Sequence, residues 1–449
     1  MTINPEIFKA YDIRGTFPDQ VNTEVFYLIG RALVKQTKAK KVVVGHDMRN
    51  SSKELEGALI KGITEQEAEA IKIGLSSTPM LYYAAWKLKS DAAAIITASH
   101  NPAEYNGLKM CFQGTEPIGE GSGMEEIKQL VLENNFLETE KKGKIKEKNI
   151  RQDYSDYVFQ FIDLSVNNKK KVVFDFGNGM GIAEKLILEK MKKVGLIEPI
   201  YLYDEYDGNF PHHEANPLKT ETLADLQEKV LATGADLGVA FDGDADRVGF
   251  VDEKGQIIPM DYPIAFLAEE VLEKNPGSLI LIDLRSSNAV SEYIQNLGGK
   301  THNCRVGHSL IKKQMREEGA IFAGELSGHY FFSENHKAEM AMLAVIKIIN
   351  LLNQKKKTLS ELTTVLKKYF HSGEINSEVK DKQAVFSLLK EKYKTGKLNE
   401  LDGVRIDFED WWFNVRASNT EPKIRLNLEA KTKELMEEKT VEILKIIRG

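Results

Sequence analysis

The residues best suited to chemistry begin with a serine in the hexapeptide Thr-Ala-Ser-His-Asn-Pro at residues 97–102. An apolar run at residues 92–96 precedes it and is typical of a buried strand, which Pro102 prevents from continuing. We therefore expect Ser99 to be exposed at the carboxyl edge of a sheet. Its hydroxyl, beside His100 and ten positions before Lys109, could act as a nucleophile or carry a transferred group. The alternative is a turn in which Ser99 only caps backbone amides.

A second loop places an acidic residue at every other position: Asp242, Asp244 and Asp246. Three carboxylates in one loop can converge on a hard cation through oxygen ligands, and Mg²⁺ is the natural choice. An EF-hand would also put Glu253 at its twelfth position, but its sixth position requires glycine and here holds Arg247. The flanking segments are also typical of strands. A solvated acidic turn without a metal is the remaining alternative.

Two further polar loops lie in the third quarter of the chain. The run Gly-Glu-Leu-Ser-Gly-His at residues 324–329 offers the carboxylate of Glu325, the hydroxyl of Ser327 and the imidazole of His329. Acceptors and donors between glycines suit the hydroxyls of a sugar, although a tight polar turn would have the same composition. The second loop contains His308, a weaker signal because a single histidine near a helix start is often structural.

A cationic loop lies near the C-terminus. Arg416 and Arg425 flank a run of hydrogen-bonding side chains that consists of Ser418, Asn419 and Thr420. Such a set is suited to the several oxygens of a phosphate monoester, and a Ser/Thr-rich helix cap is the alternative. At the other end of the chain, Tyr11 is surrounded by basic groups that include Arg14. The sequence therefore contains candidate anion-binding groups at both ends.

Composition limits the possible classes of protein. The chain has 449 residues, about three times the usual domain length of ~150, so we expect three or four domains. Its 42% apolar and 29% charged residues are typical of a globular protein. The net charge of −6 and the pI of about 6.0 argue against nucleic acid as the main partner. The only two cysteines, Cys111 and Cys304, argue against a disulfide scaffold. No leader and no long apolar window is recognisable, so we expect a cytoplasmic protein without a membrane span.

The elements that must position these loops recur along the chain. Three β-rich runs end in polar loops, and a second such run follows each of them; the pairs are residues 41–47 and 91–100, 171–178 and 235–244, and 278–285 and 319–328. Amphipathic helical patterns fill the intervals. This alternation predicts βαβ units with a mixed, largely parallel sheet in each of three tandem αβα domains.

The last segment differs, because its strand candidates are shorter and a terminal amphipathic helix follows them. It predicts a smaller α+β domain after the three α/β domains. A charged stretch at residues 138–148 and a turn at residues 254–255 suggest two of the boundaries. We place the four domains at residues 1–148, 149–253, 254–366 and 367–449.

Four of these motifs together resemble the α-D-phosphohexomutases: the serine hexapeptide, the acidic loop with Arg247, the loop at residues 324–329 and the cationic loop at residues 416–422. They occur in the order of that family and extend over nearly the whole chain. Asn419 and Thr97 make the bacterial phosphomannomutase/phosphoglucomutase branch the closest resemblance. A phosphoglucosamine mutase remains the alternative.

The resemblance implies that the four domains of this α/β chain surround one central cleft, and it implies a role for each motif. Ser99 would be a phosphoserine that shares Mg²⁺ with the three aspartates. The acid, base and charge-stabilising residues would be His100, Lys109, Arg247, His308 and His329. The residues that bind the sugar phosphate would be Tyr11, Arg14, Arg285, Glu325, Ser327, Arg416, Ser418, Asn419, Thr420 and Arg425.

The implied reaction interconverts hexose 1-phosphates and 6-phosphates of mannose or glucose. A phosphoryl group passes from Ser99 to the sugar, and the hexose 1,6-bisphosphate reverses and returns its other phosphoryl group. Arg285 stands where lysine is expected, and the stretch from Lys337 to Met340 also departs from the branch, so the contacts of both are left open. A Mg²⁺-dependent phosphatase or a sugar-phosphate sensor are the rival classes, and the oligomeric state is open.

Overall fold

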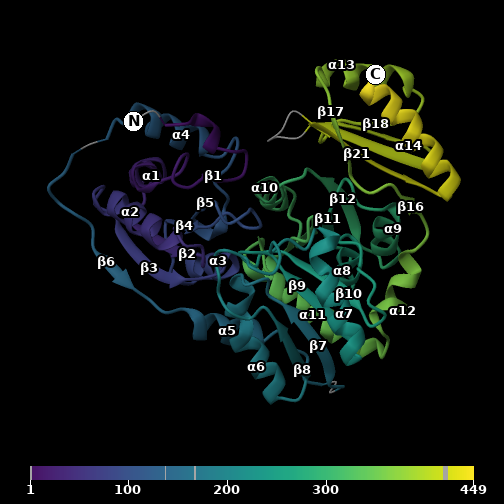
Figure 1. Ribbon diagram of the computed structural model, residues 1–449, viewed down its shortest axis with the longest axis horizontal. Helices are drawn as coiled ribbons and strands as arrows, with labels where there is room; N and C mark the ends of the chain where they lie inside the picture. The colour runs from purple at the N-terminus through teal and green to yellow at the C-terminus, as the bar shows by residue number, and fades with distance from the viewer. Residues whose placement is uncertain (1–2, 137, 166–167, 418–422) are drawn as a thin grey trace.

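The computed structural model describes residues 3–136, 138–165, 168–417 and 423–449, and these form four sheets with their own helices (Figure 1). The first sheet has the order β1 (Ile13–Thr16), β5 (Tyr105–Phe112), β4 (Ala92–Ile96), β2 (Lys41–His46), β3 (Glu69–Leu75) and β6 (Ile145–Glu147). Its helices are α1 (Thr23–Thr37), α2 (Ser52–Thr64), α3 (Thr78–Lys87) and α4 (Met124–Glu133). Strand β5 is antiparallel to both of its neighbours, whereas the other pairs are parallel.

Alternation along β4 shows how this sheet is covered on both faces. Ala92, Ala94 and Ile96 pack into an apolar cluster with α1, α2 and α4. Ala93 and Ile95 point to the other face and join a cluster that contains α3. Successive strand residues face opposite sides of a sheet, and both faces of β4 are covered by apolar clusters. This explains why β4 contains no polar residue.

The second sheet has the order β10 (Val248–Asp252), β9 (Leu237–Phe241), β7 (Lys170–Asp175) and β8 (Ile197–Leu202). Its helices are α5 (Arg151–Phe159), α6 (Lys185–Lys193) and α7 (Ala224–Thr233). Only the pair of β9 and β10 is antiparallel. The short connection between these two strands is the acidic loop, so the edge of this sheet positions the three aspartates.

The third sheet has the order β12 (Lys300–Cys304), β11 (Leu279–Asp283), β13 (Phe322–Gly324), β14 (Tyr330–Phe332) and β15 (Ala338–Glu339). Its helices are α8 (Tyr262–Lys274), α9 (Asn288–Asn296), α10 (His308–Glu318), α11 (Ala341–Lys355) and α12 (Leu359–Thr363). Leu281 of β11 packs toward α10, whereas Ile280 and Ile282 join the cluster that contains α8 and α11. That second cluster also includes residues of the first two sheets, so the three αβα units share an apolar core.

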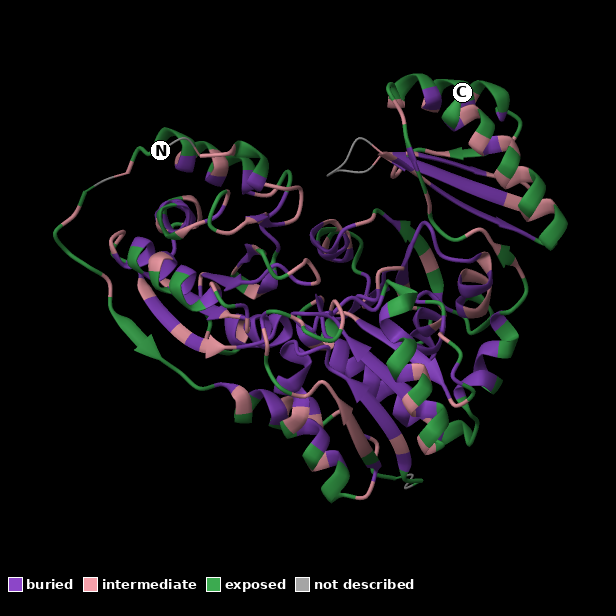
Figure 2. Cartoon of the chain, in the orientation of Figure 1, coloured by how far each residue is buried: buried purple, intermediate pink, exposed green. Residues whose placement is uncertain are grey.

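The fourth sheet is antiparallel and has the order β16 (Phe370–His371), β21 (Lys423–Ala430), β20 (Trp411–Ala417), β19 (Val404–Asp407) and β18 (Lys397–Asn399), with β17 (Ile375–Glu378) also paired to β21. Helices α13 (Lys382–Lys392) and α14 (Lys433–Arg448) complete its core. Thr432 caps α14 by accepting a hydrogen bond from the backbone N–H of Leu435. Figure 2 shows buried strands beneath helices whose outer faces are exposed.

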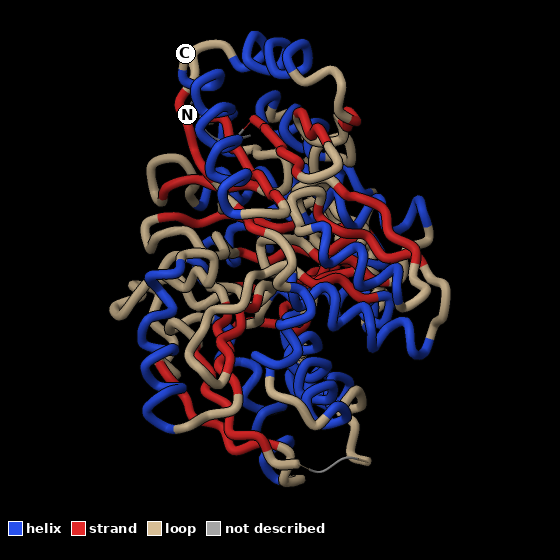
Figure 3. Tube along the Cα trace, turned by 90° about the vertical axis from the view of Figure 1, so that its right-hand side faces the viewer, coloured by secondary structure: helices blue, strands red, loops and turns tan. Residues whose placement is uncertain are grey.

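The predicted fold class is confirmed: three αβα units with mixed, largely parallel sheets are followed by a smaller α+β unit. In the view of Figure 3 strands lie between helices through most of the molecule. The charged segment expected to be a solvated crossing is exposed, but it also contains the edge strand β6. Within the part of the chain that the structure describes, no helix is both long and apolar enough to cross a membrane.

A buried carboxyl joins the first two units. Glu184 is 1% exposed and accepts a hydrogen bond of 3.2 Å from the hydroxyl of Tyr154, with the hydroxyl of Ser77 at 3.5 Å. Its second oxygen has no hydrogen-bond partner among the described residues. Burial raises the pKa of Glu184 to about 8 from its ordinary value of 4.5, so the folded chain favours the protonated form.

This gives a pH-dependent prediction for the substitution Glu184→Gln. Since the pKa of the buried carboxyl is raised, its contribution to stability is present below pH 4.5 and is lost as the pH rises through about 8. We expect the free energy of unfolding, measured with urea, to fall by about 2–4 kcal/mol more in the wild type than in the variant between pH 5 and pH 8. Glu228→Gln on the exposed face of α7 is the matched control. Equal pH dependence of Glu184→Gln and wild type would contradict the assignment.

Candidate active site

Ser99 lies at the contact between the first and second units. Its hydroxyl donates a hydrogen bond of 2.8 Å to Oδ2 of Asp242, and the Nδ1 atom of His100 lies 3.1 Å from the Oγ atom of Ser99. The prediction that Ser99 is exposed is wrong, because the residue is fully buried. The acidic loop covers it: a Cβ atom on Gly243 would lie only 2.3 Å from the carbonyl oxygen of Ser99.

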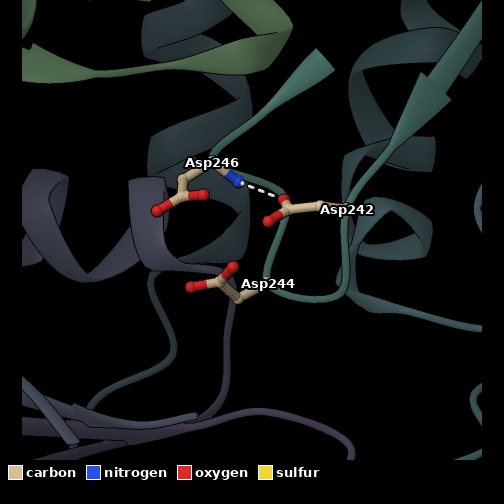
Figure 4. A group of neighbouring side chains, drawn as sticks. All are labelled: Asp242, Asp244 and Asp246. Carbon is tan, nitrogen blue, oxygen red and sulfur yellow. Dashed lines mark hydrogen bonds between the residues drawn. The ribbon is translucent and has the colours of Figure 1, made fainter. Parts of the chain in front are cut away.

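The three predicted metal ligands converge as expected from their spacing. Asp242, Asp244 and Asp246 are fully buried, and one potential ligand atom from each lies within 4.8 Å of the others. Figure 4 shows the three side chains on this loop with their carboxylates close together. The turn is closed by Oδ1 of Asp242, which accepts hydrogen bonds of 3.1 Å from the backbone N–H groups of Asp246 and Arg247.

The donor set fits a divalent cation. It consists of carboxylate oxygens, and Oδ1 of Asp244 is buried without a hydrogen-bond partner among the described residues. The other oxygen of Asp244 accepts a hydrogen bond of 2.6 Å from Thr78, which begins α3. Thr78 was not identified from the sequence, and no local motif marks it. These carboxylates could therefore bind a metal ion.

Lys109 of β5 is the main cation of the cluster. Its Nζ donates to Asp244 at 2.6 Å and also bonds Asp246. Burial alone would lower the pKa of Lys109, but Asp244 and Asp246 raise it, so the side chain is charged. Burial, followed by the charges of Asp246 and Asp244, also raises the pKa of Asp242, to about 8. A raised pKa favours the charged form of the lysine but the neutral form of this carboxyl.

His329 connects the acidic loop to the third unit. The backbone N–H of Val248 donates to Gly328 at 3.1 Å, which brings His329 beside Arg247. Its Nε2 lies 3.3 Å from Asp246, and its Nδ1 lies 2.6 Å from Oε2 of Glu325. Burial lowers the pKa of this imidazole, but Asp246 and Glu325 together outweigh that effect and raise it to about 9.

Glu325 and Ser327 lie together, as the sugar-binding prediction requires. Ser327 donates a hydrogen bond of 2.6 Å to Oε2 of Glu325, while Oε1 accepts one of 2.9 Å from the backbone N–H of Gly307. Burial opposes ionisation of Glu325, but its hydrogen bond with His329 lowers the pKa. The loop therefore presents an ionised, fixed carboxylate next to a hydroxyl.

His308 begins α10 and is buried. Its ring lies 6.0 Å from that of His329 and 5.9 Å from that of Tyr11, whose hydroxyl donates to the backbone of Val306. Neither ring nitrogen of His308 has a hydrogen-bond partner among the described residues. Burial, followed by the charge of Lys312, holds the pKa of His308 well below its usual range, so the imidazole is neutral.

Arginines of the third and fourth units converge on Glu374. The guanidinium groups of Arg285, Arg416 and Arg425 lie 3.3, 3.5 and 3.0 Å from its carboxylate. Arg285 is also bound by Asp283, which resolves the contacts left open from the sequence. The predicted ligands Ser418, Asn419 and Thr420 lie outside the described residues. Glu374 was missed from the sequence because nothing nearby marks it.

The structure also shows the contacts of Arg14 and of the stretch from Lys337 to Met340. Arg14 donates a hydrogen bond of 2.6 Å to Asn101, so it lies against the serine loop. Lys337 donates to the backbone of Met315 in α10, and Glu339 pairs with Lys312, 3.1 Å away. The stretch from Lys337 to Met340 therefore contacts α10 through two side chains.

The close approach of Gly243 to Ser99 predicts that Gly243→Ala is destabilising. The added methyl group would overlap a backbone carbonyl, and overpacking of this kind costs about 1–3 kcal/mol. Gly57→Ala is the matched control, because no atom lies within 4 Å of its added Cβ, and it should be neutral or stabilising by up to about 1 kcal/mol. Thermal unfolding of both variants checks this. Equal melting temperatures would contradict the contact.

Known proteins share this arrangement. Models of the phosphoglucomutase/phosphomannomutase α/β/α domains I, II and III match residues 5–138, 152–255 and 259–369, and the model of the C-terminal domain matches residues 374–446. A phosphomannomutase of Methanocaldococcus jannaschii is 41% identical over 448 residues, covering 98% of this chain and 97% of that protein. A phosphomannomutase/phosphoglucomutase of Pseudomonas syringae is 38% identical over 440 residues, covering 96% and 92%.

The solved structure of a phosphoglucomutase/phosphomannomutase family protein from Burkholderia thailandensis is 29% identical and superposes with a TM-score of 0.91. The superposition covers 99% of this chain and 97% of that one. Full-length similarity of this kind agrees with the four motifs and with the site that they form. The chain therefore belongs to the phosphoglucomutase/phosphomannomutase family, the hexose phosphate mutases that its motifs resemble.

Proposed function

We propose that the chain interconverts the 1-phosphates and 6-phosphates of mannose and glucose through a phosphoserine at Ser99 and a hexose 1,6-bisphosphate. The observation that carries this proposal is the contact of 2.8 Å between the Ser99 hydroxyl and Asp242. It joins a potential phosphoryl carrier on one unit to a cation-binding loop on another. Burial of Ser99 also favours transfer to a sugar over transfer to water.

Mg²⁺ is the cation that the site suits best. Asp242, Asp244 and Asp246 would hold it together with a phosphate oxygen of the modified serine. When bound, the ion would neutralise charge on the phosphoryl group and on the carboxylates. Lys109 and Arg247 provide further positive charge at the same place, since both lie within 4.0 Å of the aspartates.

Transfer requires a base for the sugar hydroxyl that attacks phosphorus. The P–O bond to Ser99 breaks as the new P–O bond to the sugar forms, and the hydroxyl proton passes to a neighbouring group. His308 suits this role because it is neutral and unbonded within the described structure. His329 is charged, so it suits the stabilisation of negative charge, and His100 lies beside the serine itself.

The second phosphate of the substrate needs its own binding groups. Arg416 and Arg425 provide them on the fourth unit, and Arg285 provides another on the third. We call these three arginines the cationic cradle. Because it would bind whichever phosphate is not reacting, one cradle would serve both orientations of a bisphosphate. Phosphoryl transfer to O1 and to O6 can then use the same catalytic groups.

The test is Ser99→Ala. Turnover of glucose 1-phosphate and mannose 1-phosphate, with hexose bisphosphate present, should fall by at least about a thousandfold, because the variant lacks the nucleophile. Intact-mass measurement should find a phosphate on the wild type that is absent from the variant. Ser90→Ala, another buried serine of the first unit, is the control.

Retention of wild-type turnover by Ser99→Ala would disprove that Ser99 carries the phosphoryl group. Steady release of inorganic phosphate from the wild type would instead favour a phosphatase. Preferential turnover of glucosamine 1-phosphate would favour the phosphoglucosamine mutase alternative.

The sugar loop predicts a preference between epimers. Glucose and mannose share the configuration of their 3- and 4-hydroxyls, which Glu325 and Ser327 would bind under this proposal, whereas galactose inverts carbon 4. An unpaired polar group costs about 1–3 kcal/mol, so galactose 1-phosphate should react roughly 5- to 150-fold less efficiently. Measurement of kcat/KM for the three sugars checks this. Ser327→Ala should reduce the discrimination, and an unchanged ratio would contradict the assignment.

A further inference from the structure

One arginine binds most of the backbone of the serine loop. Arg49 follows β2 and is 3% exposed. Its Nη1 donates to the carbonyl oxygens of Pro102 and Tyr105 at 2.7 and 2.9 Å. Its Nη2 donates to those of Ser99 and Asn101 at 2.9 and 2.5 Å. A single planar guanidinium group therefore spans the loop from the serine to the start of β5.

The loop needs such a partner. Ser99 has a φ of +51°, a left-handed conformation that is uncommon for a residue with a side chain. A conformation of this kind persists when surrounding contacts determine it. Three of the four carbonyls, those of Ser99, Asn101 and Pro102, lie in the loop before β5, where no strand pairing is available to them. The guanidinium therefore supplies donors that a sheet would otherwise supply.

Asp47 fixes the arginine itself. Its Oδ1 accepts from the backbone N–H of Arg49 at 3.0 Å, and its Oδ2 lies 3.3 Å from Nε. The hydroxyl of Ser52 donates to Oδ1 at 2.5 Å, and the backbone N–H of Asp47 donates to Ile96 at the end of β4. Asp47 therefore links three elements: its carboxylate binds the arginine and the start of α2, and its backbone N–H binds the end of the strand that leads to Ser99.

The second unit covers this assembly. The ring centre of Phe210 lies 5.1 Å from the guanidinium carbon of Arg49. A Cβ atom on Gly208 would lie 2.9 Å from the Cα of Arg49, so only glycine allows this approach. Asn209 accepts a hydrogen bond of 3.0 Å from the side chain of Asn50. Residues 207–210 thus shield the guanidinium from water, which strengthens its hydrogen bonds.

We propose that Arg49 is a positioning residue for phosphoryl transfer, because it holds the backbone that orients the Ser99 hydroxyl toward Asp242. This rests on the proposed function, in which Ser99 carries the phosphoryl group. Arg49 bonds the carbonyl of Ser99 and not its hydroxyl, so it acts through the loop. A displacement of about 1 Å of a reacting atom can reduce a rate about a hundredfold.

The test compares Arg49→Lys with Arg31→Lys. An ammonium group keeps the charge but cannot replace the planar fork that reaches four carbonyls. Arg31, on α1, is the matched control because it is another buried arginine of the same unit, and it binds Glu138 and Tyr27. Dephosphorylated enzyme is mixed with hexose 1,6-bisphosphate, and intact mass follows the appearance of phosphate on Ser99 in a single turnover.

Arg49→Lys should slow this phosphorylation per folded molecule by about ten- to a hundredfold. The KM for glucose 1-phosphate should stay within about twofold, since the phosphate cradle lies on other units. Arg31→Lys should phosphorylate at the wild-type rate. A purely structural role for Arg49 would instead lower the folded fraction, measured by near-UV circular dichroism, and leave the rate per folded molecule unchanged. That result would overturn the proposal.

Asp47→Asn provides a second measurement, because it loosens the arginine without removing it. Asp47→Asn should also slow phosphorylation, but by a smaller factor than Arg49→Lys does. If Arg49→Lys does not fold, Asp47→Asn is the variant that tests the proposal. A wild-type rate in Asp47→Asn in that case would overturn the proposal. Failure of the proposed function looks different: the wild type itself would then acquire no phosphate at Ser99.

Discussion

Three carboxylates in one buried loop are the constraint on which the arrangement of the units depends. Asp242, Asp244 and Asp246 are all inaccessible to solvent, and ionised groups in such a place require compensating charge. The first unit provides Lys109 on β5, and the third provides His329, whose position depends on backbone pairing with the second. The contacts among the three units are therefore electrostatic as well as apolar.

The buried aspartates also determine which neighbouring groups are charged. The cations that offset the aspartates are also those that would face a phosphoryl group on Ser99. His308 stands apart from them in being neutral, because burial and Lys312 disfavour its charged form. In the proposed mechanism, the groups that would stabilise negative charge and the group that would accept a proton therefore differ in charge because their environments differ.

Much of this arrangement was predictable from local patterns. Apolar runs followed by polar loops predicted the strands, and parallel strands bring the loops at their carboxyl ends to one edge. The alternating spacing of Asp242, Asp244 and Asp246 predicted their convergence, which the structure shows. Where neighbours in sequence determine the geometry, as in this loop, the interpretation succeeded.

Contacts between distant segments were not predictable. Ser99 was expected to be exposed, but Gly243, far away in the sequence, lies against it. Thr78, Arg49 and Glu374 likewise acquire their roles from partners on other elements. A single charged or hydroxyl residue without a local motif gives no sign of such a partner, so only the tertiary structure identifies it.

The fourth unit is attached differently from the other three. Its apolar cluster includes no residue of another unit among those described. Its links to the third unit are polar: Asp402 accepts from the backbone of Val306 at 3.0 Å, and Glu374 pairs with Arg285. Interfaces of this kind exchange their bonds for water more readily than apolar cores do.

This polar attachment suits the task of the cationic cradle. The guanidinium of Arg416 is buried, which lowers its pKa, and the neighbouring charge of Arg285 acts in the same direction. Glu374 offsets this repulsion among the arginines by lying between them. A bisphosphate that must reverse its ends needs a cradle that binds a phosphate strongly and still allows it to leave. Under the proposed function, a separate core with a polar interface would allow the cradle to open while the buried charges around Ser99 stay in place.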